Sequence, residues 1–286
     1  DCHAGSTKPS AEVRSIHWPM GRLLSCSNAR FLQQSFIRMD KIVLITGASR
    51  GIGAATALLA ARQGWAVAVN YARNGEAAES VVRHIVDAGG RAVAVRADVA
   101  VESEVAAMFA AVDQGLGRIT ALVNNAGVVD RPAQVAEMTG ERLRRMFDIN
   151  VLGSFYCARE AVRRMSTKRG GAGGSIVNVS SAAARLGAAH QYVDYAAAKG
   201  AVDVLTLGLA REVAAEGIRV NAVRPGLIET EIHASGGLPD RVRDLAHQVP
   251  MGRGGTAAEV AEAIVWLMSD ASPYTTASFM EVSGGR

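Results

Sequence analysis

The stretch Thr46–Gly53, "TGASRGIG", follows the apolar run "KIVLI" and precedes the alanine- and leucine-rich segment "AATALLAARQG". This pattern predicts a buried strand, a tight turn and a helix. The start of a helix offers unpaired N–H groups and a positive dipole end, which bind a pyrophosphate. Gly47, Gly51 and Gly53 would let the backbone turn and approach the phosphates closely. The spacing G-x-x-x-G-x-G varies the commoner G-x-G-x-x-G, so the loop alone does not separate a nucleotide site from an ordinary turn.

Outward from this loop, short β-branched runs alternate with longer helical patterns. Strands are expected at 42–46, 66–70, 92–98, 119–125, 175–181 and 218–225. Helices are expected at 52–63, 76–88, 101–115, 140–166, 195–215 and 257–269. Such alternation predicts right-handed βαβ units and one doubly wound parallel sheet with helices on both faces. The fold class is therefore α/β, in a single domain.

The composition is that of a globular protein and excludes several classes. Of 286 residues, 49% are hydrophobic and 20% charged, and the net charge is +4. The basic residues are not clustered, which argues against a nucleic-acid-binding protein. No apolar stretch approaches the length of a membrane span. The three cysteines (Cys2, Cys26 and Cys157) lack metal-binding spacing, so we expect reduced thiols, a cytoplasmic protein and no metal site.

Residues 1–38 differ from the remainder of the chain, because they are rich in Ser and Arg and show no sustained period. We expect them to form an N-terminal extension, non-native or disordered, ahead of a catalytic domain at 39–286. An alternative is an organellar presequence, since "GRLLSCSNARFLQQSFIR" interleaves basic with apolar residues and contains no acid.

Four further features lie where a dinucleotide would be bound. Asp98 ends the third expected strand and could accept from an adenine amino group. "NNAG" (124–127) ends the fourth strand, at the edge where ligands contact an open α/β sheet. Asn150 is a polar residue inside an expected helix, and "RPG" (224–226) ends the sixth strand. Their order and spacing together point to a nucleotide-binding enzyme.

Over residues 40–286 the chain resembles the short-chain dehydrogenase/reductase family. The resemblance is carried by "TGASRGIG", "ADV", "NNAG", Asn150, "NVSS", Tyr195-x-x-x-Lys199 and "RPG". It implies a Rossmann-type fold, a nicotinamide cofactor, and a catalytic set of Asn150, Ser181, Tyr195 and Lys199. In that set Ser181 binds the substrate oxygen, Tyr195 is the acid/base, and Asn150 holds a water that links Lys199 to solvent.

The Tyr195–Lys199 pair has its own chemical logic. A carbonyl that receives hydride needs a proton, and an unperturbed tyrosine, with a pKa near 10, is a poor acid/base at neutral pH. Lys199 lies four residues on, so both side chains share one helix face, and its charge would lower the tyrosine pKa. Tyr192 lacks such a lysine and is expected to line the substrate pocket. Of the two serines in "NVSS", Ser181 is preferred over Ser180, with one extra residue before Tyr195 placed in the loop "GAAHQYVD".

The second strand distinguishes between the two nicotinamide cofactors. An acid at its end would bind the ribose 2′-OH of NAD, but residues 68–74 contain no Asp or Glu. Arg50 and Arg73 could instead pair with a 2′-phosphate, so we predict NADP(H). The predicted cofactor contacts are Gly47, Ser49, Arg50, Gly51, Ile52, Gly53, Arg73, Asp98, Val99, Asn125, Ala126, Gly127, Tyr195, Lys199, Pro225, Gly226 and Ile228.

The resemblance favours a 3-oxoacyl-carrier-protein reductase-like enzyme that reduces a carbonyl to an alcohol reversibly. The alternatives are a glucose-type or secondary alcohol dehydrogenase and, in a different class, a non-catalytic NADP-binding regulator. Glu216 stands where carrier-protein reductases often have a basic residue, which weakens carrier-protein docking, although 163–169 is basic. The segment after "RPG" is expected to form a lid, and a homotetramer is expected by resemblance. Ala277 replaces a usual Gly before the final strand, so the turn there is in question.

Overall fold

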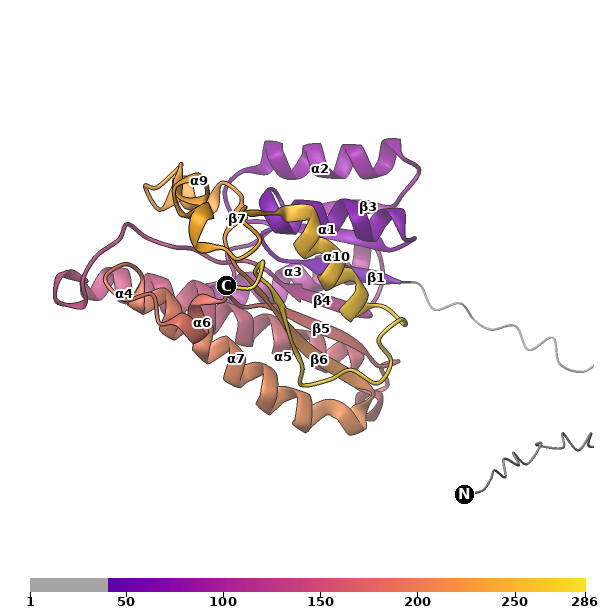
Figure 1. Cartoon of the computed structure of the whole chain (residues 1–286). Coiled ribbons are helices and arrows are strands. Elements are labelled where there is room, and N and C mark those ends of the chain that lie inside the picture. Colours follow the sequence, from indigo (N-terminus) through magenta and orange to yellow (C-terminus); the bar gives the residue numbers. More distant parts are fainter. Residues whose placement is uncertain (1–40) are drawn as a thin grey trace, which may run out of the picture. The chain divides into compact units, whose positions relative to one another are not determined.

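The computed structural model describes residues 41–286, and at its centre is a seven-stranded sheet in which all neighbouring strands are parallel (Figure 1). The order is β3-β2-β1-β4-β5-β6-β9. The strands are β1 (Ile42–Ile45), β2 (Ala66–Tyr71), β3 (Ala92–Arg96), β4 (Ala121–Asn124), β5 (Gly174–Val179), β6 (Ile218–Pro225) and β9 (Phe279–Val282). The predicted α/β fold class, with one doubly wound sheet, is confirmed.

Strand β1 shows why the apolar runs form this sheet. All four of its residues are buried. Val43 and Ile45 belong to one hydrophobic cluster and Ile42 and Leu44 to a second, because successive side chains point to opposite faces. A strand covered by helices on both faces is apolar throughout rather than alternating.

The helices divide between these two clusters. The first cluster contains residues of α1 (Gly51–Arg62), α2 (Gly75–Asp87) and α10 (Ala257–Met268). The second contains residues of α3 (Glu102–Gly115), α5 (Gly153–Met165) and α7 (Val193–Val213). Thr256 caps α10 in a capping box with Glu259, as its sequence suggests.

The helix expected at 140–166 has an unpredicted irregularity. It consists of α4 (Gly140–Phe147), a π-helical turn (Asp148–Leu152) and α5, and Asn150 lies in the turn. A π-helical turn inserts a residue into the helical repeat and is frequent at functional sites. The residues 140–166 were expected to form one continuous helix, and the interruption around Asn150 was not expected.

The region predicted as a lid has secondary structure of its own. A two-stranded parallel pair, β7 (Ile228–Glu229) with β8 (Gly255–Thr256), brackets the short helices α8 (Ile232–Ser235) and α9 (Arg241–Leu245). Figure 1 shows β7 and α9 at the end of the sheet opposite to the start of β1. This is the edge where the parallel strands finish.

The prediction about residues 1–38 and the exact start of the domain at residue 39 lie outside the described residues. Within residues 41–286, no helix is both long and apolar enough to cross a membrane.

Candidate active site

Side chains of neighbouring strands hold the loop between β1 and α1 in place. The Thr46 hydroxyl accepts hydrogen bonds from the main-chain N–H groups of Asn125 and Ala126, at 3.0 and 2.9 Å. The Asn125 amide donates to the main-chain oxygens of Thr46 and Gly47, at 2.9 and 3.1 Å. On the other side, buried Asn70 of β2 accepts from the Gly47 N–H at 3.1 Å. Both strands beside β1 therefore fix the glycine loop.

The glycines of this loop serve two different purposes. Gly47 has a φ of +61°, a left-handed conformation that side chains rarely adopt. At position 53, a Cβ would lie 2.6 Å from the Asn125 Nδ2 atom and from the Gly47 carbonyl oxygen, so only glycine fits. Gly53 is buried beneath the loop, although it was predicted as a cofactor contact. Its observed role is close packing of helix against strand.

The N-terminus of α1 has no internal cap. Arg50 at its N-cap is extended and makes no side-chain capping hydrogen bond, and no acidic residue lies in the first turn. Its first N–H groups and positive dipole end are thus not satisfied by a side chain of the helix itself, and the nearby carboxylate is that of Glu231, 3.6 Å from where a Cβ at Gly51 would lie. This arrangement fits the phosphates of a dinucleotide.

A cavity of about 530 Å³ extends along this loop and the ends of β2, β3 and β4. Most of the predicted cofactor contacts line it, namely Gly47, Ser49, Arg50, Gly51, Ile52, Arg73, Asp98, Val99, Asn125, Ala126 and Gly127. Sequence reasoning missed several of its other lining residues: Asn70, Tyr71, Arg145, Thr230, Glu231 and Ser235. The last three belong to the lid segment, which is far from the glycine loop in the sequence. No periodic pattern in the sequence marks residues that reach a cavity only after folding.

A second cavity, of about 390 Å³, adjoins the first and shares Ile52, Asn125 and Gly127 with it. It is lined by Ser181, Tyr195, Lys199, Pro225, Gly226 and Ile228, together with Tyr192 and residues of the lid. The structure therefore brings the predicted serine, tyrosine and lysine to one cavity, next to the one along the glycine loop. Tyr192 lines this cavity as expected.

Three of the predicted catalytic side chains meet within that cavity. Ser181 hydrogen-bonds to the hydroxyl of Tyr195. The Lys199 ammonium donates to the Val179 carbonyl at 2.8 Å and lies 5.6 Å from the centroid of the Tyr195 ring. Ser180 instead points into the protein, where its hydroxyl donates to the Lys199 carbonyl at 3.3 Å. The geometry thus agrees with the preference for Ser181 over Ser180.

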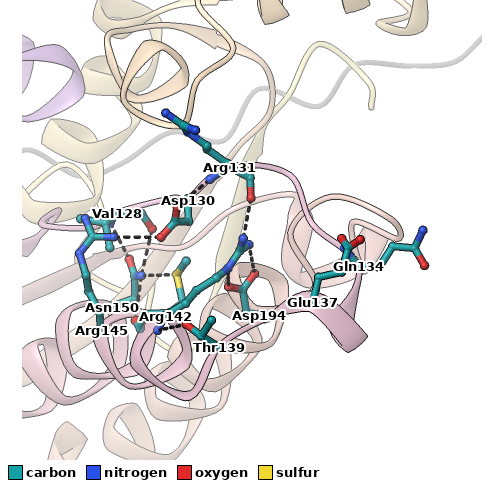
Figure 2. Close-up of polar contacts among 11 residues, drawn as sticks. Val128, Asp130, Arg131, Gln134, Glu137, Thr139, Arg142, Arg145, Asn150 and Asp194 are labelled. Atoms are coloured by element: carbon teal, nitrogen blue, oxygen red, sulfur yellow. Dashed lines mark hydrogen bonds and ion pairs between the residues drawn. The ribbon is translucent and has the colours of Figure 1, made fainter.

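Asn150 completes the set but is occupied by main-chain partners (Figure 2). It is fully buried, its Oδ1 accepts from the Val128 N–H at 3.0 Å, and its Nδ2 donates to the carbonyls of Val128 and Met146. A Cβ at Gly127 would lie 2.7 Å from this Oδ1 and 3.5 Å from the Lys199 ammonium. Asn150 therefore anchors the chain after β4 beside Lys199, through the π-helical turn.

Burial shifts the pKa values of the two titratable groups in opposite directions. It raises the pKa of Tyr195 to about 12, against the hydrogen bond from Ser181, which lowers it. Burial also lowers the pKa of Lys199 to about 8, although Asp203 opposes this shift. The charge of Lys199 was expected to lower the pKa of Tyr195, but in the protein alone desolvation dominates.

A buried ion pair beside Tyr195 was not predicted (Figure 2). Asp194, whose side chain is 0% exposed, accepts from the Nε and Nη2 atoms of Arg142 at 2.8 and 3.2 Å. Arg142 also donates to the Arg131 carbonyl, which joins α4, α7 and the loop after β4. The available signal was an acid directly before the tyrosine in "YVDY", but nothing in the sequence identifies its partner 52 residues away.

Comparisons with known proteins agree with this geometry. Residues 47–286 match the family described as enoyl-(acyl carrier protein) reductase. The uncharacterized oxidoreductase YgfF of Escherichia coli is 56% identical over 245 residues, covering 86% of this chain and 99% of that protein. The 3-oxoacyl-[acyl-carrier-protein] reductase FabG of Staphylococcus aureus is 38% identical over 250 residues, covering 87% and 99%. A crystal structure of a short-chain type dehydrogenase/reductase from Mycobacterium marinum matches with a TM-score of 0.80 and 37% identity, covering 86% of this chain and 94% of that one.

Proposed function

The chain belongs to the short-chain dehydrogenase/reductase family, and from that premise we propose that it is an NADPH-dependent enzyme that reduces a ketone to a secondary alcohol reversibly. The observation that carries this proposal is the cavity where Ser181, Tyr195 and Lys199 meet, next to a cavity along the glycine loop. Catalysis needs both a proton source at the carbonyl oxygen and a hydride source at its carbon, and the two adjoining cavities supply room for each.

The protein's own groups would act on the carbonyl oxygen. The Tyr195 hydroxyl donates the proton, and Ser181, which already hydrogen-bonds to Tyr195, orients the substrate oxygen. Lys199, held by the Val179 carbonyl, places a positive charge beside the tyrosine ring and stabilises tyrosinate as it forms. Asn150 fixes the chain next to Lys199. A bound nicotinamide would supply the hydride.

We assign NADP(H) as the cofactor on the residues of the first cavity. The uncapped start of α1 suits the pyrophosphate, and Asp98 lines the cavity at the end of β3, where an adenine would lie. Arg50 and Arg73 also line it, and neither makes an ion pair within residues 41–286. Arg50 donates to the Ser235 hydroxyl at 3.2 Å, and both guanidinium groups lack a carboxylate partner there, which suits a 2′-phosphate.

The proposed catalytic chemistry is tested by Tyr195→Phe. With NADPH and a panel of β-ketoacyl thioesters, sugars and small diketones, the variant is expected to lose at least about a thousandfold in kcat, because the proton donor is removed. Tyr274→Phe is the matched control, since Tyr274 is exposed and lines neither cavity. Unchanged reduction by Tyr195→Phe would contradict the mechanism, whereas a wild type that binds NADPH but reduces no carbonyl of the panel would favour the non-catalytic regulator.

The cofactor is tested by titration with NADPH and NADH. NADPH is expected to bind at least about tenfold more tightly, and Arg73→Met to remove most of that preference. Arg83→Met, which changes an exposed arginine of α2 that lines neither cavity, is the control. Tighter binding of NADH would refute the assignment.

For the substrate, we keep a 3-oxoacyl reductase-like activity, with a sugar or secondary alcohol dehydrogenase as the alternative. Docking of an acidic carrier protein needs free basic residues, yet Arg163 and Arg164 both pair with Glu160. Lys168 pairs with Glu216. Much of the basic charge at 163–169 is thus neutralised, which favours small substrates over carrier-bound ones.

We also propose a cytoplasmic homotetramer. Apolar side chains are exposed along α4, the π-helical turn, α5 and α7, namely Phe147, Leu152, Phe155 and Val204. A Cβ at Gly200 or Gly208 of α7 would meet no atom within 4 Å, so another helix could approach closely there. Exposed apolar residues on neighbouring helices are typical of a protein–protein interface.

A further inference from the structure

The cavity around Tyr195 has an uneven charge. Its basic lining residues are Lys199, His233, Arg241 and Arg286, and no Asp or Glu is among the described residues that line it. Lys199 is accounted for by the proposed chemistry. The other three, His233 and Arg241 of the lid and Arg286 of the C-terminal segment, have no part in that chemistry.

Arg241, at the start of α9, is held in a defined position. Its Nη2 donates to the Gln191 side-chain oxygen at 2.7 Å, and its guanidinium carbon lies 5.0 Å from the centroid of the Tyr192 ring. Tyr192 precedes the catalytic Tyr195 by three residues, and both line the same cavity. The Nε and Nη1 atoms of Arg241 make no hydrogen bond to the described residues, so they remain available to a ligand.

The positive charge at this point is not neutralised by the protein. Neither Arg241 nor Arg286 forms an ion pair within residues 41–286, whereas Arg243, two positions along the same helix, pairs with Asp240 and Asp244. Burial, followed by the charge of Arg241, lowers the pKa of His233 and of Arg286. Partly buried, unpaired cations that repel one another are costly unless an anion binds between them.

We propose, resting on the function above, that the substrate is a carboxylate-bearing ketone or secondary alcohol, whose carboxylate binds Arg241 while its carbonyl or hydroxyl reaches Tyr195. The bond to Gln191 uses only one of the five N–H groups of Arg241, so one edge of the planar guanidinium keeps two parallel N–H groups, which match the two oxygens of a carboxylate. Leu186, Leu227 and Ile232 also line the cavity, and their side chains suit an aliphatic or alicyclic body between the two polar ends.

The reaction leaves the carboxylate unchanged. In the direction of reduction, bound NADPH would supply the hydride to the carbonyl carbon while Tyr195 gives its proton to the oxygen, so that a hydroxy acid and NADP⁺ would result. The anionic group contributes binding and orientation, because it fixes the distance between Arg241 and the reacting carbon.

The cofactor phosphates do not account for Arg241. Arg241, Gln191 and Tyr192 line only the cavity around Tyr195. Arg50 and Arg73, the candidates for the 2′-phosphate, line only the cavity along the glycine loop. Arg241 and the Arg50–Arg73 pair therefore face different cavities, which leaves Arg241 for a ligand other than the 2′-phosphate.

Matched substrates test this assignment in the full chain. 4-Oxopentanoate and 3-oxocyclohexanecarboxylate are each compared with their methyl esters at saturating NADPH. The free acids are expected to have kcat/KM values at least about tenfold higher than the esters, mainly through KM. Equal or better reduction of the esters would overturn the proposal.

Two variants locate the effect. Arg241→Met keeps the stem length and is expected to reduce the acid-to-ester ratio to about one, while Arg243→Met, in an exposed ion pair of the same helix, keeps the wild-type ratio. An unchanged acid-to-ester ratio in Arg241→Met would refute the proposal. If NADPH affinity also fell in this variant, Arg241 would be assigned to the cofactor instead. If the wild type preferred a coenzyme A thioester to the keto acids and Arg241→Met lost this preference, Arg241 would bind a phosphate. That result would also refute the proposal that it binds a carboxylate.

These measurements distinguish an error in the carboxylate assignment from an error in the proposed function. If acids and esters are reduced equally and Tyr195→Phe abolishes both reactions, only the carboxylate assignment is wrong. If no carbonyl compound is reduced, or Tyr195→Phe is as active as the wild type, the proposed function itself is wrong.

Discussion

At the scale of single residues, Tyr195 and Lys199 share an environment that favours the neutral form of both side chains. Burial raises the pKa of Tyr195 to about 12 and lowers that of Lys199 to about 8. The hydrogen bond from Ser181 acts in the other direction on the tyrosine. At physiological pH Tyr195 therefore carries the proton that reduction consumes, but in the free protein it is a weaker acid than an exposed tyrosine.

The pH dependence of the two directions should therefore differ. Oxidation of an alcohol needs tyrosinate, so its kcat/KM is expected to rise by about tenfold per unit between pH 6 and 8, while reduction, which needs the protonated tyrosine, does not rise. Ser181→Ala removes the bond that lowers the Tyr195 pKa, so it should lower the rate of oxidation throughout this range and leave its slope with pH unchanged. Initial rates in both directions check this, and a pH-independent oxidation would contradict it.

The Asp194–Arg142 pair is expected to matter for stability. Asp194→Asn leaves Arg142, which is 11% exposed, without its carboxylate and should lower the free energy of unfolding by about 3 kcal/mol. Asp130→Asn is the control, because the Asp130–Arg145 pair is 33% and 42% exposed and should contribute less than about 1 kcal/mol. Denaturant unfolding measures both, and equal losses would show that burial does not set the cost.

At the scale of elements, the turn before β9 carries strain that the sequence already marked. Ala277, where a Gly is usual, has a φ of +57°, and its N–H donates to the Val220 carbonyl at 2.8 Å. This hydrogen bond joins the turn to β6 and holds Ala277 in the left-handed conformation, which the alanine side chain disfavours. A left-handed alanine costs about 1–2 kcal/mol relative to the usual backbone conformations.

Ala277→Gly is therefore expected to raise the free energy of unfolding by about 0.5–1 kcal/mol, since the strain relieved exceeds the added freedom of the unfolded chain. The melting temperature should rise by about 1–4 °C. In the matched control Ala106→Gly, at an exposed site of α3, stability should instead fall by about 1 kcal/mol. A loss of stability in both variants would mean that the turn is unstrained.

At the scale of the whole molecule, strands far apart in the sequence build one site. Parallel strands finish at the same edge of the sheet, so the glycine loop after β1 and the serine after β5 both reach the two adjoining cavities. The helices α5 and α7 cover the sheet and also expose Phe155 and Val204. The same scaffold thus leaves an apolar surface for assembly outside the site.

The proposed tetramer gives a direct test of that surface. Phe155→Glu places a charge on the exposed face of α5 and is expected to convert the assembly to a smaller species, seen by light scattering after gel filtration, because charge is unfavourable at an apolar interface. Val86→Glu, on the exposed face of α2, should keep the wild-type mass. A monomeric wild type would refute the tetramer, and an intact Phe155→Glu tetramer would place its interface elsewhere.

Most of the sheet could be predicted because each strand and helix depends on local pattern. The six expected strands and six expected helices correspond to observed elements, apart from small shifts at their ends and the interruption around Asn150. The short pair β7–β8 was missed, since two residues carry no periodicity. The π-helical turn was missed because one inserted residue displaces the apolar pattern by only about 100°, which is hard to separate from the irregular pattern of an ordinary helix.

The sequence by itself determined the α/β fold, the glycine loop and the spacing of Tyr195 from Lys199, because these follow from neighbours along the chain. Only the tertiary structure decided that Asn150 is bound to Val128, that Arg142 pairs with Asp194, and that burial outweighs the lysine charge at Tyr195. The physical reason is distance along the chain. Desolvation and ion pairing depend on which side chains meet in space, and residues 22 or 52 positions apart meet only after the sheet has formed.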